Sequence, residues 1–145
     1  MNPFNIILAD VSSENRKDLT EFLESHYYCS VIGQANNAES FLQLGDLIPK
    51  ADVLILDIHL FKFSGCQLSQ RISIQYPNTK VIILVRPEDY KYLVNLMGIN
   101  LKEIVYKTSL FSDIIPALER VLEGKTMLSS LNIVSNNQMN LNSSY

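Results

Sequence analysis

The sequence predicts an α/β fold, in which a doubly wound, five-stranded parallel sheet lies between two helical layers. The first observation is the run Val53–Ile58, which is apolar at every position except Asp57. A strand buried on both faces of a parallel sheet lacks polar alternation in this way. The second observation is the regular alternation of strand-like and helix-like segments along the chain. Because crossovers between parallel strands are right-handed, this alternation places helices on both faces of one sheet.

The individual elements follow from local patterns and from capping residues. Strands are expected at 4–9, 27–34, 53–58, 80–85 and 103–106. Helices are expected after Ser12 or Ser13, after Asn36 or Asn37, over 66–76 behind a loop at 59–64, over 87–97 and over 110–123. Ser and Asn are favoured N-caps, and Pro87 suits a first helical turn. Pro116 lacks an amide hydrogen, so we expect the last helix to begin near Ser112–Asp113 or to kink there.

The chain has 145 residues, of which 47% are hydrophobic, and a net charge of -3. This composition is typical of a globular protein. These values argue against a disordered chain and against a basic nucleic-acid-binding protein. No apolar run approaches the roughly 20 residues of a membrane span, and the N-terminus lacks the basic start of a signal peptide. The two cysteines, Cys29 and Cys66, match no metal spacing and are expected to be free thiols of a cytoplasmic protein.

The chain changes character after Gly124 and ends in the polar, low-complexity stretch 136–145. We therefore expect one domain over 1–124 and a linker or disordered tail over 125–145.

Three residues that could take part in chemistry lie at predicted strand ends: Asp10, Asp57 and Lys107. The carboxyl ends of parallel strands meet at one edge of a sheet, so these side chains are expected to face the same crevice. Two carboxylates and an ammonium group suit a hard cation together with a phosphoryl group. For Asp57 alone, a helix N-cap or a solvated loop carboxylate is the alternative.

With these residues in place, the chain resembles the receiver domain of two-component response regulators, in the subfamily with a helix-turn-helix output domain of the LuxR/NarL type. The resemblance covers roughly Phe4 to Gly124. The matching stretches are Ile6–Val11, Val31–Ala38, Asp57–Gly65, Val81–Val85, Lys107–Ser109 and Gly124–Ser129. The resemblance implies a flavodoxin-like sheet with strand order 2-1-3-4-5 and a role in phosphorelay signalling and transcription regulation.

The resemblance also implies roles for single residues. Asp57 would be the phosphoacceptor for a histidine kinase, and Lys107 would pair with the phosphoryl oxygens. Asp10, Asp57 and the backbone carbonyl of His59 would hold Mg²⁺. The side chain of His59 has no role in the family and is expected to be an exposed loop side chain.

Several positions depart from the family pattern. Val11 stands at the position of a second acid that contacts the metal, and Val85 stands where a Thr or Ser binds the phosphoryl group. Ile104 replaces a switch Tyr or Phe, Phe61 replaces a loop proline, and Thr108 stands where many receivers have a proline. Losing a carboxylate and a hydroxyl weakens both cation binding and phosphoryl transfer. Mg²⁺ binding is therefore expected to be weak or absent.

Three functions are compatible with this pattern of residues. We favour an atypical receiver that acts through dimerisation or docking with little or no phosphorylation. The alternative is a conventional receiver, phosphorylated on Asp57 and regulating transcription through a DNA-binding domain outside this chain. The third is a small α/β phosphatase. A haloacid-dehalogenase-type enzyme would need an Asp where His59 stands, so the chain is expected not to be an enzyme.

The expected partners follow from the surface and from the end of the chain. No basic recognition helix follows Gly124, so this chain alone is expected to bind neither DNA nor a membrane. Helical spacing cannot bury all of the apolar residues at 90–97 against one sheet. Because exposed aromatic patches mark partner surfaces, we expect a homodimer through the face formed by the helices at 87–97 and 110–123.

Overall fold

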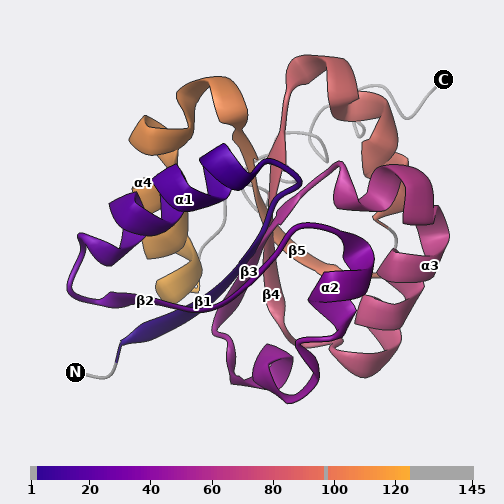
Figure 1. Ribbon diagram of the computed structural model, residues 1–145, viewed down its shortest axis with the longest axis horizontal. Helices are drawn as coiled ribbons and strands as arrows, with labels where there is room; N and C mark the ends of the chain where they lie inside the picture. The colour runs from indigo at the N-terminus through magenta and orange to yellow at the C-terminus, as the bar shows by residue number, and fades with distance from the viewer. Residues whose placement is uncertain (1–2, 97, 125–145) are drawn as a thin grey trace, which may run out of the picture.

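The computed structural model describes residues 3–96 and 98–124 and shows a parallel sheet between two helical layers (Figure 1). The strands are β1 (Phe4–Ala9), β2 (Cys29–Ala35), β3 (Val53–Asp57), β4 (Lys80–Val85) and β5 (Asn100–Tyr106). Their order is β2-β1-β3-β4-β5, and every neighbouring pair is parallel. The predicted α/β fold and the strand order 2-1-3-4-5 are therefore confirmed.

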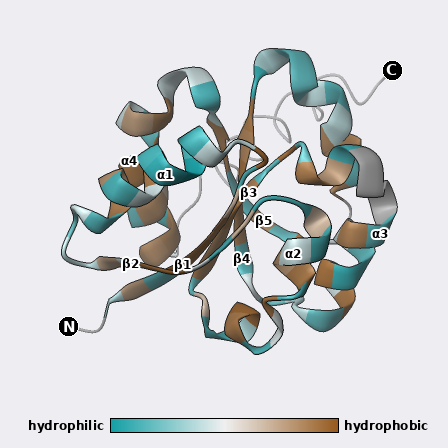
Figure 2. Ribbon diagram, viewed as in Figure 1, coloured by the Kyte–Doolittle hydropathy of each residue, from teal (hydrophilic) through white to brown (hydrophobic). Residues whose placement is uncertain are grey.

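Each face of the sheet carries its own apolar core. The helices α1 (Ser13–Glu24) and α4 (Leu110–Leu122) cover one face, and α2 (Ala38–Leu42) and α3 (Leu60–Gln75) cover the other (Figure 1). All five residues of β3 are buried. Figure 2 shows the apolar strands at the centre and polar residues on the outer sides of the helices. This distribution explains why the central strand has no polar alternation.

Both predicted helix caps near the site are confirmed. The Ser12 hydroxyl accepts a hydrogen bond from the Asn15 amide at 3.2 Å and begins α1. Asn37 begins α2, and its side chain forms a capping box with Ser40, whose amide donates to Asn37 Oδ1 at 2.7 Å. Such caps satisfy amides that have no partner within the first helical turn. A 3₁₀ helix, η1 (Gly45–Lys50), leads from α2 to β3.

The start of α3 differs from the prediction, because the helix begins at Leu60 and the expected loop at 59–64 is absent. The Phe61 amide donates to the Ile58 carbonyl at 3.0 Å, and the Lys62 amide donates to the His59 carbonyl at 3.2 Å. Leu60 and Phe61 are both buried, and Phe61 is fully so. Without a proline at Phe61, nothing interrupts the backbone there, and burial of the two side chains stabilises the earlier start.

The segment expected as a helix over 87–97 is a 3₁₀ helix, η2 (Pro87–Asn95). Among its nine residues only Asp89 is buried. Most helical stability in proteins comes from packing an apolar face, and η2 has little of that packing. Tyr90 and Val94 are 49% and 72% exposed, so the prediction of exposed apolar side chains here is confirmed for the described residues. Met97 lies outside the described residues.

The helix α4 begins at Leu110, earlier than predicted, after the short 3₁₀ turn η3 (Lys107–Ser109). The expected start near Ser112–Asp113 is therefore wrong. Pro116 lies inside the helix on its exposed side. The Ser112 carbonyl, which would otherwise accept from residue 116, can be hydrated there, and the proline therefore costs less than it would in the core.

Three further expectations concern the rest of the chain. β2 is an edge strand as predicted, and Cys29 is a buried free cysteine. The expected linker or tail over 125–145 and the side chain of Cys66 lie outside what the structure describes. No helix in the described part of the chain is long and apolar enough to cross a membrane.

Candidate functional site

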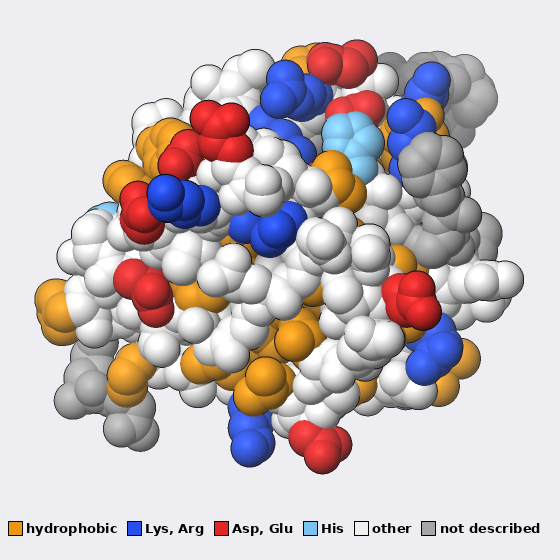
Figure 3. Space-filling view, viewed as in Figure 1, with side chains coloured by type: hydrophobic (Ala, Val, Ile, Leu, Met, Phe, Trp, Pro, Cys, Tyr) orange, Lys and Arg blue, Asp and Glu red, His pale blue; other side chains and the backbone are white. Residues whose placement is uncertain are grey.

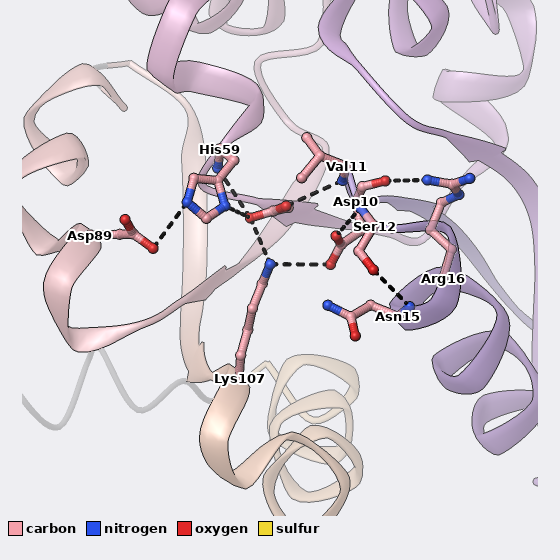
Figure 4. Close-up of polar contacts among 9 residues, drawn as sticks. Asp10, Val11, Ser12, Asn15, Arg16, His59, Asp89 and Lys107 are labelled. Carbon is pink, nitrogen blue, oxygen red and sulfur yellow. Dashed lines mark hydrogen bonds and ion pairs between the residues drawn. The ribbon is translucent and has the colours of Figure 1, made fainter.

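The three residues singled out at strand ends meet at one edge of the sheet. Asp10 follows β1, Asp57 ends β3 and Lys107 follows β5. Lys107 Nζ lies 3.0 Å from Asp57 Oδ1 and 3.4 Å from Asp10 Oδ2 (Figure 4). Asp57 and Asp10 are 0% and 2% exposed, and the Lys107 side chain is 7% exposed. The structure therefore places two carboxyl groups and one ammonium group in a single buried cluster.

Backbone amides hold both carboxyl groups in position. Asp57 Oδ1 accepts from the His59 amide at 3.1 Å, and Oδ2 accepts from the Val11 amide at 3.3 Å. Asp10 Oδ1 accepts from the Ser12 amide at 2.9 Å. The complete burial of Asp57 excludes a solvated loop carboxylate. The N-cap of α3 is His59, which makes no side-chain capping bond, so Asp57 is not the cap either.

The two carboxyl groups are buried together, but their pKa values move in opposite directions. Burial and the charge of Asp57 raise the pKa of Asp10 to about 6. Burial alone would also favour the neutral form of Asp57, but the Lys107 ammonium and the His59 amide outweigh it and lower the pKa of Asp57. A hydrogen bond between the two carboxyl groups acts in the same two directions. Asp57 is thus the group that keeps its negative charge most readily.

His59 is not the exposed loop side chain that was expected, because its ring lies between two carboxyl groups. Nδ1 is 3.1 Å from Asp57 Oδ1, and Nε2 is 3.1 Å from Asp89 Oδ2 in η2 (Figure 4). The His59 side chain is 25% exposed. Neither Nδ1 nor Asp89 Oδ2 forms a hydrogen bond among the described residues, so both contacts are ion-pair contacts by distance alone. The early start of α3 directs the ring inward.

A comparison with protein families identifies the family of this chain. Residues 6–119 match the family described as the response regulator receiver domain. The chain belongs to this family. Receiver domains are the signalling domains of two-component response regulators, and Asp10, Asp57 and Lys107 all lie within the matched residues.

Individual relatives agree with this assignment. The receiver is 28% identical to the oxygen regulatory protein NreC of Staphylococcus epidermidis over 83% of this chain and 56% of NreC. It is 22% identical to the response regulator GacA of Pseudomonas aeruginosa over 86% of this chain and 58% of GacA. The chain thus spans little more than half the length of these relatives.

Solved structures lead to the same fold. The non-phosphorylated receiver domain of the stress response regulator RcsB from Escherichia coli is 25% identical, with a TM-score of 0.71. The match covers 86% of this chain and 97% of that domain. RcsB of Salmonella typhimurium gives a TM-score of 0.74 at 23% identity, over 86% of this chain and 64% of RcsB.

Receiver domains generally bind Mg²⁺ for phosphorylation, so the ligands available beside Asp57 are of interest. Mg²⁺ requires nearly octahedral oxygen ligands. The described residues contain no group of three or more His, Cys, Asp or Glu side chains that could hold a metal. Val11 is 50% exposed and lines a cavity of about 520 Å³ together with Ala38 and Leu60. The apolar side chain of Val11 therefore lies where the family pattern places a second acid, in a cavity that Glu39, His59 and Lys62 also line.

Two further departures, Val85 and Ile104, are also apolar side chains packed in the core. Val85 is the last residue of β4 and is fully buried in the core on the α3 side. Ile104 in β5 is half-buried and packs against the same core. Neither side chain can donate a hydrogen bond to a phosphoryl oxygen.

Sequence reasoning missed three polar contacts around the site. Asp89 approaches His59, Arg16 donates to the Asp10 carbonyl, and the Tyr106 hydroxyl donates to the Tyr90 hydroxyl at 2.6 Å. Asp89 and Tyr90 both belong to η2, where the sequence predicts a helix over 87–97 with exposed apolar side chains. No spacing in the sequence relates these residues to the strand ends.

Proposed function

We propose that this chain is an atypical receiver, with weak or absent Mg²⁺-dependent phosphorylation at Asp57, that acts on an output through dimerisation or docking. The observation behind this proposal is Val11, an exposed apolar side chain directly beside the buried Asp57. In this proposal Asp57 is the phosphoacceptor position, Lys107 its cationic partner, and Asp10 and the His59 carbonyl the remaining metal ligands. Val85 and Ile104 are the degenerate phosphoryl-binding and switch positions.

The electrostatics of the cluster support this proposal. The ammonium group of Lys107 already lies against both carboxyl groups, so the cluster does not need a cation to neutralise it. A cation entering the site would have to compete with the Lys107 ammonium group. It would find only two carboxylate ligands, those of Asp10 and Asp57. Binding of Mg²⁺ is therefore weak, and charge developing on a transferred phosphoryl group is poorly stabilised.

The partners in this proposal are inferred from the relatives and from the surface. The solved relatives include an RcsB–DNA complex and RcsB dimers bound to DNA. By analogy, a helix-turn-helix output domain of the LuxR/NarL type would bind DNA in the whole protein. The receiver would dimerise in the cytoplasm. Acidic and basic side chains are interspersed over the face drawn in Figure 3, as suits docking to a protein better than to nucleic acid. A histidine kinase is the partner if Asp57 retains any phosphorylation.

The test compares the wild-type chain with Val11→Asp and with Val11→Asp/Val85→Thr. Isothermal titration calorimetry with Mg²⁺ measures cation binding. The intact mass after treatment with acetyl phosphate and Mg²⁺ measures phosphorylation. We expect the wild type to bind Mg²⁺ feebly, Val11→Asp to bind about tenfold more tightly, and the double variant to gain one phosphoryl group. Equal Mg²⁺ affinity in all three proteins and ready phosphorylation of the wild type would instead support a conventional receiver.

A further inference from the structure

The carboxyl group of Asp57 has no exposed surface in this structure. Lys107 Nζ at 3.0 Å, the His59 amide at 3.1 Å and His59 Nδ1 at 3.1 Å all contact Oδ1. The Val11 amide contacts Oδ2 at 3.3 Å. Any phosphodonor must reach one of these two oxygens. At least one of the groups that cover them must therefore move before Asp57 can react.

The imidazole ring of His59 is the covering group that can move most easily. Its side chain is 25% exposed, compared with 7% for Lys107 and 2% for Asp10. Apart from the two side chains, Asp57 is contacted by the backbone amides of Val11 and His59, which follow β1 and β3 and are held in place by the sheet. Rotation of the His59 side chain toward solvent would expose Oδ1 and leave the backbone unchanged.

Asp89 holds this ring from the opposite side. Its Oδ2 lies 3.1 Å from His59 Nε2, and the residue is 6% exposed (Figure 4). Buried polar atoms usually have hydrogen bonds, and each exception calls for an explanation. His59 Nδ1 and Asp89 Oδ2 form no such bond among the described residues. Moving the ring away from these two contacts therefore breaks no hydrogen bond of either atom.

The position of Asp89 links the ring to η2. The next residue, Tyr90, accepts a hydrogen bond from Tyr106, which directly precedes Lys107. Two consecutive residues of η2 therefore touch both sides of the Asp57 site, one through His59 and one beside Lys107. Tyr92 and Leu93 of η2 are partly buried against the core on the α3 side, and Asn95 donates to the Phe61 carbonyl at 3.3 Å, so the Asp89 and Tyr90 contacts are two of several that attach the segment.

We propose that His59 covers Asp57 and that Asp89 is the positioning residue that keeps this cover closed, so that access to Asp57 depends on the position of η2. The proposal relies on the proposed function for the role of Asp57 as phosphoacceptor. Coupling between two sites is reciprocal. A partner that draws η2 away from the sheet therefore opens Asp57, and a group attached to Asp57 displaces His59 and releases η2.

The first test measures access to Asp57 in the Val11→Asp/Val85→Thr background. His59→Ala, Asp89→Ala and the pair are treated with acetyl phosphate and Mg²⁺, and phosphoryl gain is followed by intact mass. Each single substitution should raise the initial rate about fivefold, because a cover that is closed most of the time reduces reactivity by the open fraction. The pair should add little beyond one substitution, since both remove the same contact. The matched control, Glu88→Ala at the exposed neighbouring position, should leave the rate unchanged.

The second test needs no phosphate and uses the otherwise wild-type chain. Hydrogen exchange measured by mass spectrometry should become faster across η2 in His59→Ala, at amides such as Asp89 and Leu96, whose bonds close its turns. Unchanged rates and unchanged exchange in His59→Ala would overturn the cover, as would fully additive effects of the two substitutions. Ready phosphorylation of the wild type would instead contradict the proposed function, and the comparison within the Val11→Asp/Val85→Thr background separates the two results.

Discussion

Lys107 Nζ lies 3.0 Å from Asp57 Oδ1, and this contact joins the carboxyl ends of β5 and β3 inside a nearly solvent-free cluster. Asp10 shares the same ammonium group at 3.4 Å. The pair therefore contributes to the stability of the receiver as well as to its site. Breaking a buried ion pair by removing one partner leaves an uncompensated charge, which is strongly destabilising.

Lys107→Ala should lower the free energy of unfolding by about 3 kcal/mol at pH 7.5, because two buried carboxylates lose their cation. The deficit should shrink as pH falls toward 5, since the carboxyl groups can then become neutral by binding protons. Urea unfolding at the two pH values measures both effects. Lys17→Ala, at an exposed position of α1, is the control and should change stability by less than about 0.5 kcal/mol. A loss that does not depend on pH would argue against this electrostatic origin.

Asp10→Asn should stabilise the receiver at pH 7.5. The pKa of Asp10 is about 6 in the folded protein and 3.8 as its ordinary value, so the folded state binds more protons between these values. The contribution of Asp10 to stability is therefore complete below pH 3.8 and is lost as pH rises through 6. A shift of this size corresponds to about 3 kcal/mol, and loss of the Lys107 contact reduces the expected gain to about 1 kcal/mol.

Thermal unfolding at several pH values tests this sign. The melting temperatures of Asp10→Asn and the wild type should be close at pH 4, should separate as pH rises from 4 to 6, with the variant higher, and should stay apart above pH 6. If the variant is less stable than the wild type at pH 7.5, then ionised Asp10 stabilises the fold through Lys107 more than its burial costs.

Phe61→Ala should lower the free energy of unfolding by about 3 to 4 kcal/mol, because Phe61 is fully buried and its removal leaves a cavity. The residue lies in the first turn of α3, so the variant should also shift the start of that helix toward the expected position near residue 66. Urea unfolding gives the stability, and amide exchange at 60–65 reports the helix start. Phe111→Ala is the matched control: Phe111 is 49% exposed, and its loss should cost about 1 kcal/mol or less.

Self-association should proceed through the surface of η2. Val94 is 72% exposed and Tyr90 is 49% exposed, and both belong to the segment through which, with α4, a dimer is expected. Val94→Asp should weaken association at least about tenfold in sedimentation equilibrium, because a charge would be buried at the interface. Ile74→Asp, at a 77% exposed position of α3, is the control and should associate as the wild type does. A wild-type chain that stays monomeric at high concentration would contradict this prediction.

The sequence by itself determined the sheet and the three residues at its edge. Apolar runs such as Val53–Leu56 require burial on both faces, and right-handed crossovers leave few arrangements of the strands. Since parallel strands end at one edge, Asp10, Asp57 and Lys107 had to meet once the strands were placed. The caps Ser12 and Asn37 were also predictable, because a capping bond involves only residues within one helical turn.

Tertiary structure alone decided what surrounds Asp57. Local rules placed a loop at 59–64, but burial of Leu60 and Phe61 favours helix there and directs the His59 ring inward. The contact of that ring with Asp89 joins segments 30 residues apart in the chain, and no local pattern encodes such a distance. The same holds for the pKa values of Asp10 and Asp57, which move in opposite directions because burial and Lys107 act on the two groups unequally. Residue types and spacing place charges at a sheet edge, but their dielectric surroundings and their non-local partners exist only after the helices have packed.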